Sequence, residues 1–191
     1  MTEPTPHRPN RILLVSGSMR SGSSNTAVLR TLATLAPEGV GTELYERLAT
    51  LPHFNPDDDY DPLDPAVVEL RAAIAGADAV LFSTPEYAGA LPGSFKNLLD
   101  WTVGGGEIYG KPVAWINASG LNAPTGGRDA HDSLRKVLGY TGAEIVEQAC
   151  VRVPIARKDV DEDGLIGDEE ISAGLRAALD ALVEHVRRAA S

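Results

Sequence analysis

Short runs of hydrophobic residues alternate along this chain with segments in which hydrophobic residues recur every three or four positions. Three runs, 12–16, 79–84 and 112–119, are apolar almost throughout and are expected to form buried strands. Residues 41–48 instead alternate between apolar and polar, which is typical of a half-exposed strand at the edge of a sheet. The segment 144–154 predicts one bent strand or two short ones.

Helical periodicity appears between these runs. The expected helices are 24–36, 65–75, 93–103, part of 126–142, and 169–189. The last of them places hydrophobic residues on one face: Ile171, Leu175, Leu179, Leu182, Val183 and Val186. Inner strands that are continuously apolar and alternate with helices indicate a parallel sheet covered on both faces. We therefore predict an α/β fold with one doubly wound domain over 11–191, a five-stranded parallel sheet, and a flexible N-terminal tail over 1–10.

Composition and charge narrow the function classes. The chain has 191 residues, 43% of them hydrophobic, which suits one domain with its own core. Its formal net charge of -10 argues against binding to nucleic acid or to an anionic membrane surface. No apolar run approaches the length of a membrane span or a signal peptide. The single cysteine, Cys150, cannot form an internal disulfide, so we expect a reducing, cytoplasmic setting.

The segment between the first strand and the first helix is rich in hydroxyl groups. It reads SGSMRSGSSN over 16–25. A helix start offers unpaired N–H groups and the positive end of the helix dipole, and the hydroxyls and Arg20 add further donors. A phosphate site is therefore predicted. The alternative is a serine-rich turn in which Ser24 or Asn25 caps the helix. Neither the dinucleotide fingerprint nor the P-loop motif occurs.

A second loop follows the strand at 79–84. It belongs to the stretch STPEYAGALPGSFKNLLDW, residues 83–101. Ligands of such sheets bind beyond the carboxyl ends of the strands, where this loop would lie beside the first. Its Pro-Glu-Tyr backbone and aromatic ring would suit a flat heteroaromatic system. The alternative is a capping turn before Gly93 with Tyr87 as ordinary packing. Both loops together point to a mononucleotide, and to FMN in particular.

These two motifs, in this order, resemble those of the NADPH-dependent FMN reductase family, whose fold is flavodoxin-like and whose members include quinone, azo-dye and chromate reductases. The resemblance implies phosphate ligands, a loop against the flavin ring and a third bordering loop. The corresponding residues are Ser18, Arg20, Ser23, Asn25 and Thr26, then Pro85, Glu86, Tyr87, Ala88 and Gly89, then Ser119 and Gly120. Ala88 departs from the family, which commonly has Asn there, so only backbone contacts are expected at that position.

No nucleophile and base stand out as a pair, and the four histidines are expected to be solvated. This fits a flavin enzyme without catalytic side chains, because the cofactor supplies the chemistry. The resemblance implies hydride transfer from NADPH or NADH to FMN and then to a quinone or similar small acceptor, with ping-pong kinetics. It also implies a homodimer or homotetramer. The alternatives are a flavodoxin-like electron carrier with a protein partner, and a calcium-regulated or cofactor-free interaction protein.

The stretch DVDEDGLIGDEE, residues 159–170, matches the EF-hand loop pattern at its fixed positions. Read alone, Asp159, Asp161, Asp163 and Glu170 would be calcium ligands. The preceding segment, however, reads as a strand with a proline, and an EF-hand needs a helix on both sides. We therefore expect no metal here, but an acidic turn that leads into the last helix.

Overall fold

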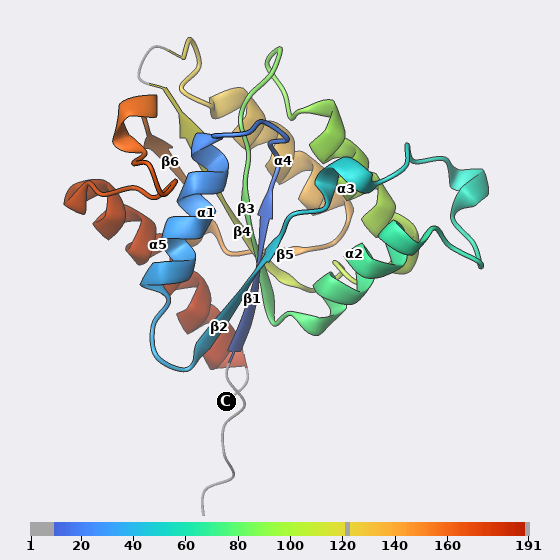
Figure 1. Cartoon of the computed structure of the whole chain (residues 1–191). Helices are drawn as coiled ribbons and strands as arrows, with labels where there is room; N and C mark the ends of the chain where they lie inside the picture. The colour runs from blue at the N-terminus through green and yellow to red at the C-terminus, as the bar shows by residue number, and fades with distance from the viewer. Residues whose placement is uncertain (1–9, 121–122, 190–191) are drawn as a thin grey trace, which may run out of the picture.

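The computed structural model describes residues 10–120 and 123–189, and within them six strands form one parallel sheet. The strands are β1 (Asn10–Ser16), β2 (Val40–Tyr45), β3 (Ala79–Ser83), β4 (Pro112–Ser119), β5 (Glu144–Ile145) and β6 (Val151–Pro154). The α-helices are α1 (Ser24–Leu35), α2 (Pro65–Gly76), α3 (Gly93–Gly105), α4 (Arg128–Tyr140) and α5 (Glu169–Ala189). Figure 1 shows the helices packed around the sheet. The predicted α/β class with a parallel sheet is confirmed.

The strand order is β2-β1-β3-β4-β5, with β6 also paired to β4. Val15 lies between Tyr45 of β2 and Phe82 of β3, so β1 has one neighbour on each side. The chain runs outward from β1 in one direction to β2 and then in the other through β3. The order of strands therefore reverses beside β1, and ligands of doubly wound sheets bind at such a switch point.

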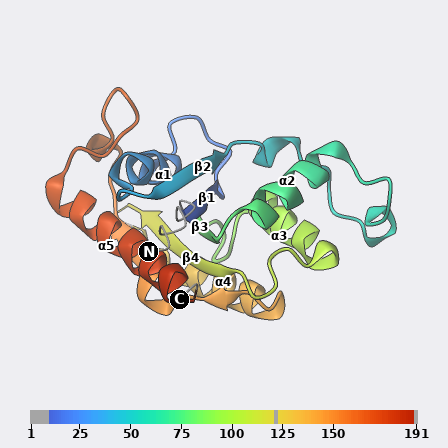
Figure 2. The same ribbon diagram turned by 90° about the horizontal axis from the view of Figure 1, so that it is seen from below.

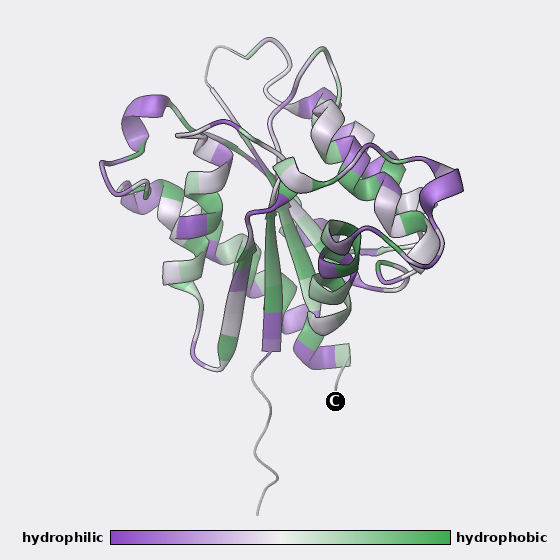
Figure 3. Cartoon of the chain, turned by 45° about the vertical axis from the view of Figure 1, so that its right-hand side comes forward, coloured by the Kyte–Doolittle hydropathy of each residue, from purple (hydrophilic) through white to green (hydrophobic). Residues whose placement is uncertain are grey.

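Helices cover both faces of the sheet, as Figure 2 shows. On one face, α1 and α5 pack on side chains such as Leu14, Leu81 and Ile116; on the other, α2, α3 and α4 pack on Leu13, Phe82 and others. Alternate residues of each inner strand point to opposite faces. Because both faces are covered, β1, β3 and β4 are apolar over most of their length, and Figure 3 shows these central strands as largely hydrophobic.

Two short strands, β5 and β6, share the position beside β4 at the edge of the sheet. Of the two forms predicted for 144–154, the structure has the two short strands and not the single bent one. Glu144 of β5 pairs with Pro112 at the start of β4, whereas β6 pairs with the final residues of β4, Ile116 to Ser119. A 3-10 turn, Glu147–Ala149, separates them and buries Ala149. The chain therefore continues from β5 to β6 along the same edge of the sheet, with no crossover between these two strands.

The element bounds agree closely with the prediction, apart from three differences. The edge strand expected over 41–48 is β2 and ends at Tyr45, and Leu48–Thr50 form a 3-10 turn instead. The helix expected to end at 103 continues to Gly105 and stops at Gly106, whose φ of 75° ends it. Asn10, which was predicted to belong to the tail, is the first residue of β1, and its N–H donates to the carbonyl of Gly39. The other tail residues, 1–9, lie outside the described part of the chain. No described helix is long and apolar enough to cross a membrane.

Candidate functional site

Three loops meet at the carboxyl edge of the sheet. We call residues 17–23 the first loop, 84–92 the second loop and 120–127 the third loop; residues 121–122 of the last lie outside the described chain. They follow β1, β3 and β4, which are neighbours in the sheet, and Figure 1 shows them at the same end of the molecule. All the predicted binding residues lie in or next to these loops.

The first loop leads into an α1 start that is rich in free donors. The N-cap is Ser23, not Ser24 or Asn25, and its hydroxyl makes no capping hydrogen bond. The first amide of α1 bonded to the backbone is that of Ala27, which donates to the Ser23 carbonyl at 2.9 Å. Within the described chain, the N–H groups of residues 21–26 have no hydrogen-bond acceptor. Such a row of donors at the positive end of a helix favours an anion.

Hydroxyl groups and one cation surround these donors. Ser16 and Thr26 share a hydrogen bond of 2.9 Å between their hydroxyls, and the Ser18 hydroxyl accepts from the Arg20 N–H at 3.3 Å. The guanidinium of Arg20 is exposed and makes no ion pair with any described residue. All four residues line a cavity of about 280 Å³ between the first loop and the end of β2.

The side chain of Asn25 faces the sheet and not this cavity. Its Oδ1 accepts from the Ser83 hydroxyl at 2.9 Å and from the Ala118 N–H at 3.2 Å, while its Nδ2 donates to the Ala118 carbonyl at 3.4 Å. The residue is only 3% exposed. The predicted role of this side-chain amide as a phosphate ligand is therefore corrected, because the amide ties α1 to β3 and β4. Only the backbone N–H of Asn25 belongs to the row of free donors.

The second loop contains a tight turn. Tyr87 and Ala90 exchange two backbone hydrogen bonds of 3.0 Å across Ala88 and Gly89, which have φ values of 51° and 71°. Two positive φ angles in succession are those of a type I′ turn. The Tyr87 side chain is 51% exposed. Within the described residues, the N–H groups of Glu86, Ala88 and Gly89 have no acceptor, so this loop does present free backbone donors, as expected.

The carboxylate of Glu86 points away from those donors. It accepts hydrogen bonds from the Thr125 hydroxyl and from the N–H groups of Asp129 and Ala130. These two amides belong to the first turn of α4, whose N-cap is Gly127. The Glu86 side chain therefore caps α4, and any contact between Glu86 and a ring system would come from its backbone.

The third loop lies beside a different cavity. Ser119 and Gly120 line a volume of about 530 Å³ together with Gly126, Arg152 and neighbouring residues of β6. The Ser119 carbonyl accepts from the Ile155 N–H at 3.0 Å. The structure thus brings these two residues to the predicted edge of the sheet, where they line a different cavity from the one described at the first loop.

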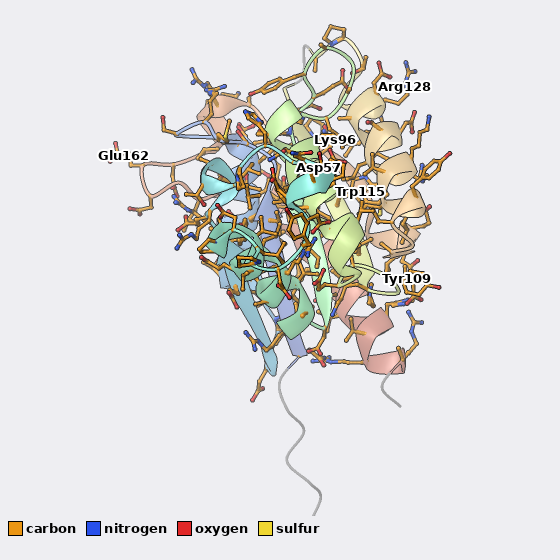
Figure 4. The ribbon with its side chains drawn as sticks, turned by 90° about the vertical axis from the view of Figure 1, so that its right-hand side faces the viewer. Asp57, Lys96, Tyr109, Trp115, Arg128 and Glu162 are labelled. Carbon is orange, nitrogen blue, oxygen red and sulfur yellow. The ribbon has the colours of Figure 1, made fainter. Side chains whose placement is uncertain are left out.

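Two titratable groups, His131 of α4 and Cys150 just before β6, are partly buried near β4. His131 was expected to be solvated, but its ring contacts Trp115 edge-on at 5.1 Å between centroids. Burial lowers the pKa of His131, and the charges of Arg135 and Arg152 lower it further. Burial also raises the pKa of the Cys150 thiol to about 12, which suits the predicted packed, unreactive cysteine. Figure 4 shows Trp115 inside the molecule and Arg128 at the outer start of α4.

The end of β2 and the residues that follow it are part of this region, although little in the sequence marks them. Residues 44–46, 48 and 49 form the far wall of the cavity at the first loop. Among them, the Tyr45 hydroxyl is buried and has no hydrogen-bond partner in the described part of the chain. Its pKa is raised to about 12, chiefly by burial and then by Glu69. The apolar and polar alternation of 41–48 predicted an edge strand, but no motif marked its end as part of a site; the structure pairs this strand with β1.

The carboxylates of the acidic loop at 159–170 accept hydrogen bonds from nearby backbone N–H groups. Asp161 Oδ1 accepts from the N–H groups of Asp163 and Leu165, and Asp159 Oδ2 accepts from the Ala156 N–H. In the described part of the chain, no group of three or more His, Cys, Asp or Glu side chains is placed to hold a metal. Figure 4 shows Glu162 projecting on the opposite side of the molecule from Arg128.

The first and second loops together offer the groups that a phosphorylated planar ligand requires. A phosphate dianion needs several N–H or O–H donors and a cation, and the first loop offers free amides, hydroxyls and the Arg20 guanidinium. The ring of such a ligand needs backbone donors and an aromatic neighbour, and the second loop offers both. The donor set therefore fits a flavin mononucleotide.

Comparison with known proteins agrees with this chemistry. The family model described as NADPH-dependent FMN reductase matches residues 10–158. An NAD(P)H-dependent FMN reductase of Pseudomonas aeruginosa is 34% identical over 180 residues, which are 93% of this chain and 96% of that protein. A quinone reductase of Escherichia coli is 30% identical over 182 residues, with the same two coverages. The solved structure of FerB, a flavoenzyme NAD(P)H:(acceptor) oxidoreductase from Paracoccus denitrificans, superposes with a TM-score of 0.82 at 28% identity, over 94% of this chain and 98% of that one.

Proposed function

Because the chain belongs to the NADPH-dependent FMN reductase family, we propose that its three loops hold FMN at the carboxyl edge of the sheet and present it to NAD(P)H and a quinone. The chain is an FMN-dependent NAD(P)H oxidoreductase of the quinone reductase type. The observation that carries the proposed location is the row of unpaired N–H groups over residues 21–26, beside Arg20 and the hydroxyls of the first loop.

The first loop would hold the phosphate. Its backbone amides and the Ser18 hydroxyl would donate to the phosphate oxygens, while Ser23, whose hydroxyl is not used in capping, adds a further donor. Arg20 would neutralise part of the charge, which matters in a chain with a net charge of -10. Thr26 acts through its hydroxyl bond to Ser16 and its free amide at the helix start.

The second and third loops would border the ring. Pro85 and Tyr87 lie in the same loop as the free amides of Glu86, Ala88 and Gly89, which can donate to the heteroatoms of an isoalloxazine. Ser119 and Gly120, at the end of β4, would lie on its other side. Bound FMN supplies the centre that accepts and returns hydride; the residues of the chain bind and orient it, and none is required as a proton donor.

The electron-carrier alternative is less supported than the reductase. The two curated relatives described above are named as reductases, and the family model has the same description. A reductase consumes NAD(P)H without a protein partner, whereas a carrier does not. One open site used in turn by NAD(P)H and by the acceptor gives ping-pong kinetics.

The phosphate part of the proposal is tested by Arg20→Gln. We expect FMN binding to weaken by roughly ten- to thirtyfold, because a charge-assisted contact to the phosphate is lost. Arg176→Gln on the outer face of α5 is the matched control and should bind FMN as the wild type does. The affinity is measured by quenching of FMN fluorescence. Equal affinities of the wild type and Arg20→Gln would place the phosphate elsewhere.

The assembly and cellular setting are also proposed. We infer a homodimer or homotetramer acting in the cytoplasm on small molecules, without nucleic acid or membrane. The family resemblance, the single thiol and the acidic charge support this. Light scattering coupled to gel filtration should give a mass two or four times the 20.2 kDa of one chain. A particle of 20.2 kDa would contradict it.

A further inference from the structure

We propose that Glu86 is a positioning residue: its carboxylate fixes the second loop against α4 and thereby sets the backbone geometry at which this loop meets FMN. The inference rests on the proposed FMN site. The Glu86 side chain points away from that site, toward α4, yet it contributes to FMN binding by holding the loop in place.

Four contacts hold the carboxylate. The Thr125 hydroxyl donates to its two oxygens at 2.6 and 2.7 Å. The N–H groups of Asp129 and Ala130 donate to Oε2 at 3.1 and 3.2 Å. The N-cap of α4, Gly127, has no side chain, so a residue some forty positions earlier in the chain caps this helix. A carboxylate at a helix start is also stabilised by the positive end of the dipole.

Glu86 makes the connection between the second loop and α4. The other hydrogen bonds of residues 85–90 are local: Tyr87 and Ala90 bond each other, and the Thr84 hydroxyl donates to the Pro85 carbonyl. Within the described chain, only the Glu86 carboxylate joins residues 85–90 to a distant element by hydrogen bonds. A loop that contains a strained alanine at φ 51° needs such an external anchor to keep one conformation.

The anchor matters for binding because free donors must be fixed before they are useful. The unpaired amides of Glu86, Ala88 and Gly89 lie within three residues of the anchored carboxylate. If the loop is released, the cost of ordering it opposes FMN binding. The same carboxylate holds the end of the third loop through Thr125, so one side chain links both loops that are proposed to border the ring.

The test compares loss of this carboxylate with loss of other helix caps. Glu86→Ala and Glu86→Gln remove its charge. Asp168→Ala and Asp64→Ala remove caps on α5 and α2, where the carboxylates accept from the N–H groups of Ile171 and Ala66 at 2.9 and 2.8 Å. All four variants lose a cap, but only the first two release the second loop. Thr125→Val and Thr125→Ser form a second pair, since the serine keeps the hydroxyl.

The readouts are the FMN affinity and, in flavin-free protein, the hydrogen exchange of amides 85–90. The Glu86 variants should bind FMN about tenfold more weakly and exchange faster over 85–90. Asp168→Ala and Asp64→Ala should unfold at lower temperature yet bind FMN within about twofold of the wild type. Thr125→Val should follow the Glu86 variants in part, and Thr125→Ser should restore binding.

Unchanged FMN affinity and unchanged exchange in the Glu86 variants would overturn the inference and reduce Glu86 to an ordinary cap. Weak binding in all the cap variants alike would also overturn it, because the effect would then be general instability. Should Glu86→Ala not fold, Glu86→Gln and the Thr125 pair decide the question. Wild-type protein that binds no FMN would instead refute the proposed function, and exchange in flavin-free protein would still show whether Glu86 fixes the loop.

Discussion

At the scale of single residues, Ala88 occupies a backbone conformation that suits other residues better. Its φ of 51° lies in the left-handed region, where Cβ crowds the backbone and where glycine and asparagine are preferred. The family commonly has Asn at this position, and the structure supplies a physical reason, because the first central position of a type I′ turn requires a positive φ. The departure at Ala88 therefore affects the energy of the turn as well as a possible side-chain contact.

We predict that Ala88→Gly raises the free energy of unfolding by about 0.5–1 kcal/mol, since the strain at φ 51° exceeds the entropic cost of glycine. Ala90→Gly is the control in the same turn. Ala90 has no positive φ, so glycine there should lower the stability by about 0.5–1 kcal/mol. Urea unfolding of the flavin-free protein measures both. A loss of stability in Ala88→Gly would show that the turn carries no strain.

Residue type was predictable from the sequence, but side-chain direction was not. The hydroxyl and amide groups of the first loop correctly marked a helix start rich in donors. Asn25, however, lies where Ser83 and Ala118 come within reach, and Glu86 lies where α4 begins, 42 residues later in the chain at Arg128. These partners become neighbours only after the sheet has formed. A motif therefore identifies the loop and leaves open which of its side chains face inward.

At the scale of elements, residues 52–54, in the loop between β2 and α2, are attached to α3 by side chains of that helix. Asn97 accepts from the Phe54 N–H at 2.7 Å and donates to the Pro52 carbonyl at 2.8 Å. The indole of Trp101 donates to the same carbonyl at 2.9 Å, and Phe54 stacks edge-on against it. Trp101 is 1% exposed, so within the chain it serves helix packing. The Asn97 side chain thus satisfies backbone groups of this loop that a neighbouring strand would otherwise satisfy.

We predict that Asn97→Ala lowers the free energy of unfolding by about 1–3 kcal/mol, because it leaves the Phe54 N–H without an acceptor and removes one of the two donors to the Pro52 carbonyl. Hydrogen exchange should accelerate over residues 51–64 in particular. The neighbour Lys96→Ala is the control: it removes only an exposed ion pair with Asp100 and should change the stability by less than about 0.5 kcal/mol. Equal effects of the two substitutions would refute this role of Asn97.

The elements themselves followed closely from the pattern of hydrophobic residues. Strands buried on both faces must be apolar throughout, which made β1, β3 and β4 plain. The pair β5 and β6 was harder, because the 3-10 turn between them depends on how both fit beside the single strand β4. The cavity wall at 44–49 was missed, since its residues carry no motif and become part of a site only through the strand order.

At the scale of the whole molecule, three side chains that do not face the proposed ligand connect the elements at the carboxyl edge of the sheet. Asn25 joins α1 to β3 and β4, and Asn117 Nδ2 donates to the Thr84 carbonyl at 2.7 Å. Glu86 joins the second loop to α4. Each loop of the proposed site is therefore fixed to its neighbour by a group that does not face the ligand, which leaves the free amides on the open side.

The central claim is that FMN bound at this edge is reduced by NAD(P)H without any protein partner. It is tested most directly by loading the purified protein with FMN, desalting it, and adding NADPH in the absence of air while the visible absorbance of the bound flavin is followed. We predict that flavin stays with the protein and that its absorbance is lost rapidly on one equivalent of NADPH, then returns when a quinone is added. Retained flavin that neither NADPH nor NADH bleaches would contradict the account and favour an electron carrier.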